Sequence, residues 1–174
     1  MHTVLHILGE LNDQDVDWLI TNGVKQLVPQ GDCVIEQGKA PTSVYIVLEG
    51  SFSVIVGGPK SKEIAQVGSG QILGEMTFLE ARAPSASVKA RMKSAVLAVP
   101  IRVLQERLKR DPAFAARFYK ALAMFLSFRL RRLTLLEAGH GDDDETSPDE
   151  LDANVLDTVY LAGARFDRMI KRLS

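Results

Sequence analysis

Hydrophobic and polar residues alternate through the middle of the chain, between about residues 26 and 100. In the segment SVYIVLEG, Val44, Ile46 and Leu48 occupy every second position, and the segment SFSVIV alternates in the same way after Gly50. A period of two places such side chains on one face of an extended strand. Four more short apolar runs, CVIEQG, KEIAQVG, SVKAR and SAVLAVP, are separated by clusters of Gly, Pro, Ser and Lys. The pattern predicts about eight strands in a small antiparallel barrel or roll.

Helical periodicity replaces this alternation on both sides of the strand region. Residues 12–22 begin with Asn and Asp, which favour the start of a helix. After Pro100, the segment IRVLQERLKR and a longer segment over 112–136 return to helical spacing. An Asp-Pro pair at the start of the longer segment supplies an N-cap and a first-turn proline. The chain is therefore predicted to be an α+β protein, a roll flanked by N-terminal and C-terminal helices.

The helix predicted at about 112–136 has a wider apolar surface than a single thin seam requires. With a rise of about 1.5 Å per residue it would be on the order of 35 Å long, which is more than a small roll covers. The excess favours a homodimer formed through this helix. The alternative is that the whole surface packs on its own roll and on the C-terminal segment. The apolar positions are Phe114, Phe118, Leu122, Phe125, Leu126, Leu130, Leu133 and Leu136.

The C-terminal part of the chain divides into an acidic segment and a final helix. Residues 137–147 are rich in acidic residues and lack periodic apolar ones, so they are interpreted as a solvated linker rather than a metal site. Ser147 and Glu150 then form a capping box around Pro148, which predicts an amphipathic helix at 148–174. The helix is expected to pack on the roll or on a dimer mate through Val155, Val159 and Phe166.

Composition and charge limit the classes of partner. The chain has 174 residues, 46% hydrophobic and 25% charged, which is typical of a globular protein with one main domain, here 1–136, and an appendage. A formal net charge of -1 does not favour DNA or an anionic membrane surface, because both require a basic excess. Cys33 is the single cysteine and no secretion signal is visible, so a cytoplasmic location is expected. The most apolar helical stretch, FYKALAMFLSF, is too short to span a membrane.

No pattern in the sequence indicates catalysis or a metal. His2, His6 and His140 are scattered without the spacing of a zinc site. The chain lacks a Gly-x-Ser-x-Gly sequence and a phosphate loop ending in Gly-Lys-Ser or Gly-Lys-Thr. Hydroxyl groups such as those of Ser85 and Ser87 are interpreted as those of loop or strand residues. An enzyme is therefore not expected, and no catalytic or metal-binding residue is assigned.

Three segments taken together resemble a known family. They are QGDCVIEQGKAPTSVYIVLEGSFSVIV, then VGSGQILGEMTFLEARAPSASVKA, then the two-part helix that follows. In this order they are similar to the cyclic nucleotide-binding domain of catabolite-activator-type transcription factors, cyclic-nucleotide-dependent kinases and gated channels, over roughly residues 10–136. The resemblance implies an eight-stranded antiparallel, jelly-roll-like β-roll flanked by helices. It also implies a ligand pocket between a phosphate-binding cassette and the long helix, with cyclic AMP or cyclic GMP as ligand and no other cofactor.

The family's cassette reads roughly G-E-[LM]-[AS]-L, a variable turn, and then P-R-[SA]-[AT]-[TSV]-V-x-A. The resemblance implies that N–H groups of its short helix and loop bind the cyclic phosphate and that its arginine neutralises the phosphate. It also implies that the glutamate accepts a hydrogen bond from the ribose 2′-hydroxyl. By position, the start of the helix corresponds to Gly74, Glu75 and Met76, and the loop after the arginine begins with Ser85 and Ala86.

The position of the cassette arginine is occupied by Pro84, which has neither a charge nor an N–H group. A charge-assisted hydrogen bond contributes about 1.5–3 kcal/mol, so its loss should weaken phosphate binding about ten- to a hundred-fold. Arg82 lies two residues earlier, and its long side chain is a candidate replacement; the alternative is that it points to solvent. In the long helix, Leu136 and Glu137 stand where some family members present hydroxyl groups to the base.

Two functions are compatible with these observations. The first is a stand-alone regulatory or signalling module that senses a cyclic nucleotide or related phosphate ligand weakly. The alternative is a dimerisation or protein-interaction scaffold with a degenerate pocket that binds no nucleotide. Fewer than forty residues follow Leu136, so the winged helix-turn-helix domain of the transcription factors, and with it DNA binding, is not expected. The output is expected to pass through an unknown protein partner. The predicted ligand-binding residues are Gly74, Glu75, Met76, Arg82, Ser85 and Ala86.

Overall fold

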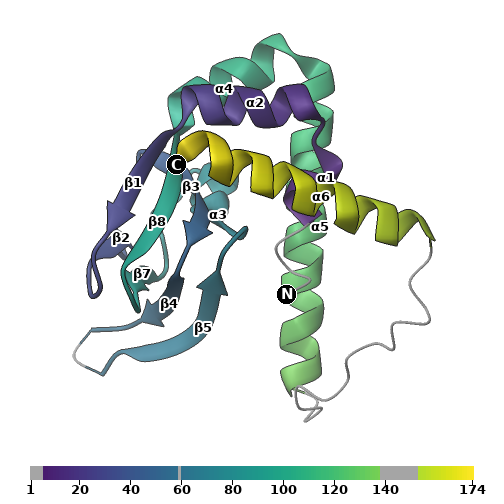
Figure 1. Ribbon diagram of the computed structural model, residues 1–174. Helices are drawn as coiled ribbons and strands as arrows, with labels where there is room; N and C mark the ends of the chain where they lie inside the picture. Colours follow the sequence, from purple (N-terminus) through teal and green to yellow (C-terminus); the bar gives the residue numbers. More distant parts are fainter. Residues whose placement is uncertain (1–5, 59, 138–152) are drawn as a thin grey trace.

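The computed structural model of the chain describes residues 6–58, 60–137 and 153–174. Within them, two helices precede the strands, one short helix interrupts the strands, and three longer helices follow (Figure 1). The helices are α1 (His6–Glu10), α2 (Asp13–Asn22), α3 (Glu75–Glu80), α4 (Ile101–Arg110), α5 (Pro112–Glu137) and α6 (Ala153–Leu173). The strands are β1 (Val24–Val28), β2 (Cys33–Ile35), β3 (Ser43–Glu49), β4 (Ser51–Val56), β5 (Lys62–Gly68), β6 (Ile72–Leu73), β7 (Ser87–Ala90) and β8 (Ser94–Pro100).

The strands of the described residues form two four-stranded antiparallel sheets. The first sheet has the order β1-β8-β3-β6, and the second has the order β2-β7-β4-β5. β3 pairs with β8 in a register that sets Tyr45 opposite Ala98 and Ile46 opposite Leu97. β4 pairs with β5 on one side and with β7 on the other. The predicted eight-stranded antiparallel roll with flanking helices is confirmed.

Two hydrophobic clusters lie on opposite faces of the first sheet. Tyr45 and Val47 of β3 belong to the cluster inside the roll, together with Phe52 of β4. Val44 and Ile46 alternate with them and belong to the cluster that the helices cover. β3 is therefore buried on both faces. The period of two predicted which of its residues share a face, but only the packing of the helices decides that the second face is also buried.

Three short elements escaped prediction from the sequence. α1 has five residues and β6 has two, which is too few for periodicity to appear. β1 carries apolar residues that are not buried, since Val24 is 60% exposed and Leu27 is 65% exposed. Pairing of its backbone with β8, together with the burial of Val28 at its end, therefore accounts for β1 as a strand.

A buried ion pair joins α2 to α5. Asn12 caps α2: its side chain accepts a hydrogen bond from the Asp15 N–H group at 2.8 Å, and its own N–H group donates to the Asp15 carboxylate at 3.0 Å. Asp15 is 1% exposed, and the Arg117 guanidinium donates two hydrogen bonds to its carboxylate, at 2.6 and 2.9 Å. Burial raises the pKa of Asp15, but the hydrogen bonds from Arg117 and Asn12 and the charge of Arg117 outweigh it, so the net pKa is lowered.

The two halves of α5 have different surroundings. The first half is buried in the cluster between the first sheet and the helices. The second half runs beside the roll in Figure 1, and there Leu130 is 66% exposed and Leu133 is 51% exposed. Packing on its own roll therefore accounts for the apolar surface of the first half alone. The buried residues of that half include Phe114, Phe118, Leu122 and Phe125.

α6 lies across α1 and α2 at a crossing of small residues (Figure 1). Ala162 is fully buried there, and Phe166 packs against the helix-covered cluster. Gly9 permits the close approach of α1, because a Cβ atom at this position would lie 2.6 Å from Cγ2 of Thr158 and 3.1 Å from its carbonyl oxygen. The N-terminal and C-terminal helices thus form one layer over the roll.

Arginine side chains of α6 complete this contact. Nη1 of Arg165 donates to the carbonyl oxygens of Leu8 and Gly9 at 3.0 and 3.2 Å, which satisfies acceptors near the end of α1. Nε of Arg165 donates to the Asp13 carboxylate at 2.8 Å. Two further arginines of α6 bind the carboxylate of Asp17 in α2. The contact between α6 and the N-terminal helices is therefore specific as well as apolar.

Part of the C-terminal prediction lies outside the described residues. This holds for residues 138–147 of the predicted linker, for the capping box of Ser147 and Glu150, and for the side chain of Val155. α6 is described from Ala153 onward. In the described ranges, no helix combines the length and the apolar character that crossing a membrane requires.

Candidate ligand-binding site

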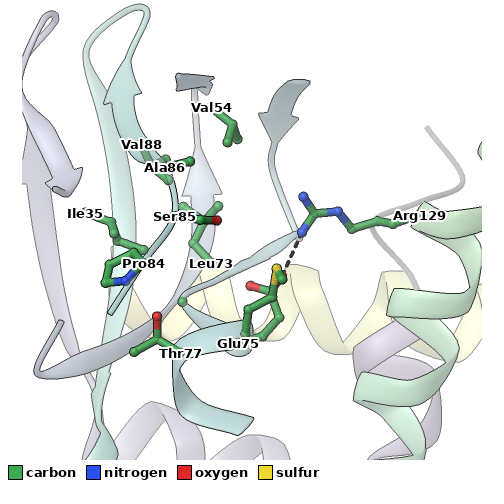
Figure 2. A pocket seen from close by; sticks show the side chains of 12 residues that line it. Ile35, Val54, Leu73, Glu75, Thr77, Pro84, Ser85, Ala86, Val88 and Arg129 are labelled. Carbon is green, nitrogen blue, oxygen red and sulfur yellow. Dashed lines mark hydrogen bonds and ion pairs between the residues drawn. The ribbon is translucent and has the colours of Figure 1, made fainter. Parts of the chain in front are cut away.

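A small cavity opens where the roll, α3 and α5 meet (Figure 2). Its volume is about 80 Å³, well below the roughly 300–1,000 Å³ of ordinary small-molecule pockets. Glu75 and Arg129 are the charged residues among those that line it. The rest of the wall is largely apolar and includes Ile35, Val54, Leu73, Ala86 and Val88.

The cavity wall includes the start of α3, which is preceded by a glycine in a left-handed conformation. Gly74 is the N-cap of α3 and has a φ of 83°, a backbone conformation that residues other than glycine rarely adopt. A Cβ atom there would also lie 3.4 Å from the carbonyl oxygen of Ser43 and 3.5 Å from Cδ1 of Ile35. The turn directs the chain from β6 into α3 and places Glu75, the first residue of the helix, at the cavity.

Glu75 is buried and paired with the long helix. It is 3% exposed, and its Oε1 accepts a hydrogen bond from Nη1 of Arg129 at 2.7 Å. Burial raises the pKa of Glu75, because the charge of Arg129 and the N–H group of Glu75 offset the loss of solvation only in part. The Arg129 guanidinium also lies over the ring of Phe125, 5.5 Å from its centroid. Figure 2 shows the Arg129 side chain reaching from α5 toward Glu75.

The loop between α3 and β7 is attached to the turn that follows β2. The carbonyl oxygen of Pro84 accepts a hydrogen bond from the Gly38 N–H group at 2.9 Å. In the same turn, the Gln37 N–H group donates a hydrogen bond to Oγ of Ser87. Pro84, Ser85 and Ala86 all line the cavity. The loop therefore presents backbone and small side chains to the cavity, and it contributes no charge.

The structure brings together five of the six residues that the sequence singled out for ligand binding. Arg82, the sixth, is exposed and is not among the residues that line the cavity. A role for these residues in binding stays a prediction. The five that line the cavity are Gly74, Glu75, Met76, Ser85 and Ala86.

Sequence reasoning missed Arg129, although its position carried a signal. The residue continues the spacing of Phe118, Leu122 and Phe125, at intervals of four and three, so it lies on the face of α5 that packs on the roll. An arginine on a buried face needs an acidic or carbonyl partner. The spacing could therefore have indicated a buried ion pair, but it could not have named Glu75, which lies 54 residues earlier.

The fold thus sets a glycine-led short helix of the β-roll beside a cavity to which the long helix contributes Arg129. The family model for the cyclic nucleotide-binding domain matches residues 25–111, half of the chain. The chain belongs to this family.

Individual relatives are similar over most of this chain but are longer. Identity to the cyclic AMP receptor protein of Thermus thermophilus is 30% over 128 residues, covering 72% of this chain and 57% of that protein. Identity to cyclic GMP-binding protein C of Dictyostelium discoideum is 30% over 129 residues, covering 71% of this chain and 5% of that protein. An uncharacterized NTE family protein of Mycobacterium tuberculosis is 25% identical over 120 residues, which cover 69% of this chain and 20% of that protein. The chain thus spans less than two thirds of each of these relatives.

Solved structures share the fold. The catabolite activator protein of Thermus thermophilus has a TM-score of 0.61 at 25% identity, with 76% of this chain and 63% of that chain covered. A cyclic nucleotide-binding domain from Methylobacillus flagellatus has a TM-score of 0.67 at 22% identity, with 75% of this chain and 78% of that chain covered. The family resemblance read from the cassette and the strands is confirmed.

Proposed function

We propose that the chain is a regulatory signalling module that binds a cyclic nucleotide or a related phosphate ligand beside α3 and transmits the binding through α5. One observation carries the proposal: residues of the cassette and a side chain of the long helix, Arg129, line the same cavity. A ligand in this cavity would contact both parts at once. By family position, Glu75 would accept a hydrogen bond from the ribose, and the backbone around Ser85 and Ala86 would face the phosphate. No enzymatic step is proposed.

The size of the cavity supports a coupling between binding and α5. A volume of about 80 Å³ accommodates a small group but not a nucleoside, and Arg129 forms part of the wall. A nucleotide that enters would therefore meet the Arg129 side chain, and we expect α5 to adjust to it. Because α5 packs on α1 and α1 packs on α6, an adjustment of α5 would reach the helix layer and a protein partner that contacts it.

Calorimetric titration of the full chain with cyclic AMP and with cyclic GMP tests the proposal. We expect saturable binding of at least one of them at concentrations below millimolar. The variant Ala86→Phe fills the cavity and should abolish the heat of binding, whereas Ala164→Phe on the exposed face of α6 should not. Absence of heat with both nucleotides at millimolar concentration would contradict the proposal.

A second candidate function is a scaffold that binds no nucleotide. Two observations favour it: Pro84 brings no charge to the loop, and the carboxylate of Glu75 already has a partner in Arg129. On this alternative the Glu75–Arg129 pair is a structural contact that holds α5 on the roll. The same titration separates the two functions, because the scaffold gives no heat while its oligomeric state is preserved.

Both candidate functions are compatible with a homodimer formed through α5, which we also propose. Exposed or half-buried apolar residues recur along α5 at intervals of four and three, which is the spacing of a two-helix seam. A second copy of α5 offers the same stripe, so the two helices can bury it against each other. The stripe consists of Tyr119, Ala123, Leu126, Leu130 and Leu133.

A further inference from the structure

The charges that line the cavity balance each other. Among the described residues that line it, Glu75 and Arg129 are the two charged ones, and they form a hydrogen-bonded ion pair at 2.7 Å. The lining also includes the hydroxyl groups of Thr77 and Ser85, which carry no charge. A phosphate that enters would add a negative charge to a site where Arg129, the cation among the described lining residues, already has a partner. We therefore expect an anion that binds here to compete with Glu75 for Arg129.

We propose that Arg129 supplies from α5 the cation that Pro84 removes from the loop, exchanging Glu75 for the phosphate of a cyclic nucleotide while Glu75 takes up a proton. This inference rests on the proposed function and adds to it the residue that neutralises the ligand. The proton comes from solvent and forms an O–H bond on the Glu75 carboxylate, and no group is oxidised or reduced. Net charge in the cavity is then zero before and after the exchange.

Arg129 has the reach and the donors for this role. Its side chain lines the cavity and is 32% exposed, so it is partly accessible to solvent. One guanidinium nitrogen, Nη1, donates to Glu75, and the fork carries five N–H groups in all. Guanidinium groups bind phosphate oxygens through two parallel hydrogen bonds. The ring of Phe125 beneath the guanidinium can support it in either arrangement, because cation–π attraction does not depend on which anion is bound.

Arg82 is the weaker candidate for the same role. It is exposed and lies outside the lining of the cavity, whereas Arg129 is already inside it. To reach a phosphate in the cavity, Arg82 would have to give up its hydration and its rotamer freedom. Arg129 would exchange one anion for another inside the cavity, so it would lose less hydration and less rotamer freedom than Arg82.

The burial of Glu75 explains why its carboxylate would take up a proton when the ligand binds. Glu75 is 3% exposed, and burial already raises its pKa while Arg129 is its partner. When Arg129 turns to the phosphate, the main group that favours the ionised form is lost and a second negative charge arrives nearby. Both changes raise the pKa of Glu75 further. A phosphodiester stays singly ionised through the neutral range, so nucleotide binding should tighten as the pH falls toward the native pKa of Glu75.

Calorimetry with cyclic AMP and with cyclic GMP at several pH values tests the exchange. In buffers of different ionisation enthalpy, the wild-type chain should take up protons on binding, up to one per ligand, and its affinity should rise by up to about tenfold per unit of falling pH. Glu75→Gln keeps an acceptor oxygen but cannot titrate, so its proton uptake and pH dependence should disappear. Arg129→Gln should bind about ten- to a hundred-fold more weakly.

Two further variants complete the design. Arg131→Gln removes an exposed arginine from the same helix and should bind as the wild type does. Arg129→Lys keeps a positive charge and replaces Arg129→Gln if circular dichroism shows that the latter does not fold; it should bind more weakly because it lacks the fork.

The outcomes separate this inference from the proposed function. Nucleotide binding that survives Arg129→Gln unchanged, that Arg82→Ala abolishes instead, or that proceeds without proton uptake overturns the inference and leaves the proposed function standing. Absence of binding in the wild type at millimolar nucleotide overturns both. Weakening by Arg129→Gln together with proton uptake that Glu75→Gln removes supports the exchange.

Discussion

At the residue scale, two buried carboxylates with similar partners have pKa values that shift in opposite directions. Asp15 and Glu75 are 1% and 3% exposed, and each faces an arginine of α5. Asp15 accepts two hydrogen bonds from Arg117 and one from the N–H group of Asn12, which together outweigh its desolvation. Glu75 accepts one hydrogen bond from Arg129, and desolvation prevails. Stronger desolvation of Glu75 and its smaller number of donors together decide the direction, although both carboxylates face a counter-charge.

The first prediction concerns Asp15→Asn. Because the pKa of Asp15 is lowered by folding, its contribution to stability is present above its unfolded value of about 3.9 and is lost as the pH falls through its native value. We expect the variant to lose about 1–3 kcal/mol of unfolding free energy at neutral pH. Urea unfolding near neutral pH and in acid measures the difference, which should shrink in acid. A difference that is the same at both pH values would refute this assignment.

The second prediction concerns Glu75→Gln in the absence of ligand. Because the pKa of Glu75 is raised by folding, its favourable contribution exists below the unfolded value of about 4.3 and is lost as the pH rises through its native value. The variant should therefore gain stability relative to the wild type as the pH rises, by at most about 1.4 kcal/mol per pH unit. Urea unfolding at several pH values from about 5 to 8 provides the measurement. A constant difference would show that burial does not dominate at this site.

At the element scale, the contact of α6 with α1 depends on the absence of a side chain. Small residues bring the helix backbones together at Gly9 and Ala162, and Arg165 then reaches the carbonyl oxygens at the end of α1. The amphipathic pattern of α6 predicted that the helix packs on the roll or on a dimer mate. It did not indicate α1 as the partner, because α1 itself is too short to be recognised from its sequence.

The third prediction tests this crossing with Gly9→Val. The added atoms would meet the Thr158 side chain and its carbonyl oxygen, so α6 must move away from α1. We expect a loss of about 1–3 kcal/mol of unfolding free energy and faster amide hydrogen exchange in α6. Gly58→Val is the matched control, since no atom lies within 4 Å of a Cβ placed there. Equal behaviour of the two variants would rule out the steric argument.

The fourth prediction concerns the stripe on α5. Leu130→Glu places a charge in the middle of the seam, where Leu130 is 66% exposed in the single chain. If two copies bury this stripe, the variant should be monomeric at concentrations where the wild type is dimeric. Sedimentation equilibrium over a range of concentrations gives the mass. Met124→Glu, at a 44% exposed residue outside the stripe, should leave the dimer intact. A monomeric wild type would contradict the proposed contact between two copies of α5.

At the scale of the whole molecule, α5 connects the cavity to the helix layer. Its Arg129 contacts Glu75 at the cavity, its Arg117 contacts Asp15 in α2, and its first half covers α1, on which α6 lies. A ligand that takes Arg129 from Glu75 would therefore act on the element that also contacts α1, α2 and α4. Figure 1 shows α5 standing between the roll and the far end of α6.

The sequence by itself determined most of the strands, the long helix and the family. Alternation in β3 and β4, the Asp-Pro start of α5 and the Gly-Glu start of the cassette are local patterns, and local patterns follow from backbone geometry and burial of one face. The sequence also located part of the cavity wall, five residues between Gly74 and Ala86, because those residues lie close together along the chain.

Only the tertiary structure decided which distant groups meet. Arg129 reaches Glu75 because the packing of Phe118 and Phe125 fixes the rotation of α5 on the roll, and no local pattern encodes that rotation. The position of Arg82 outside the cavity, the burial of both faces of β3 and the docking of α6 on α1 have the same origin. Each depends on free energy gained between segments far apart in the chain, whereas periodicity records only how one segment divides its residues between core and solvent.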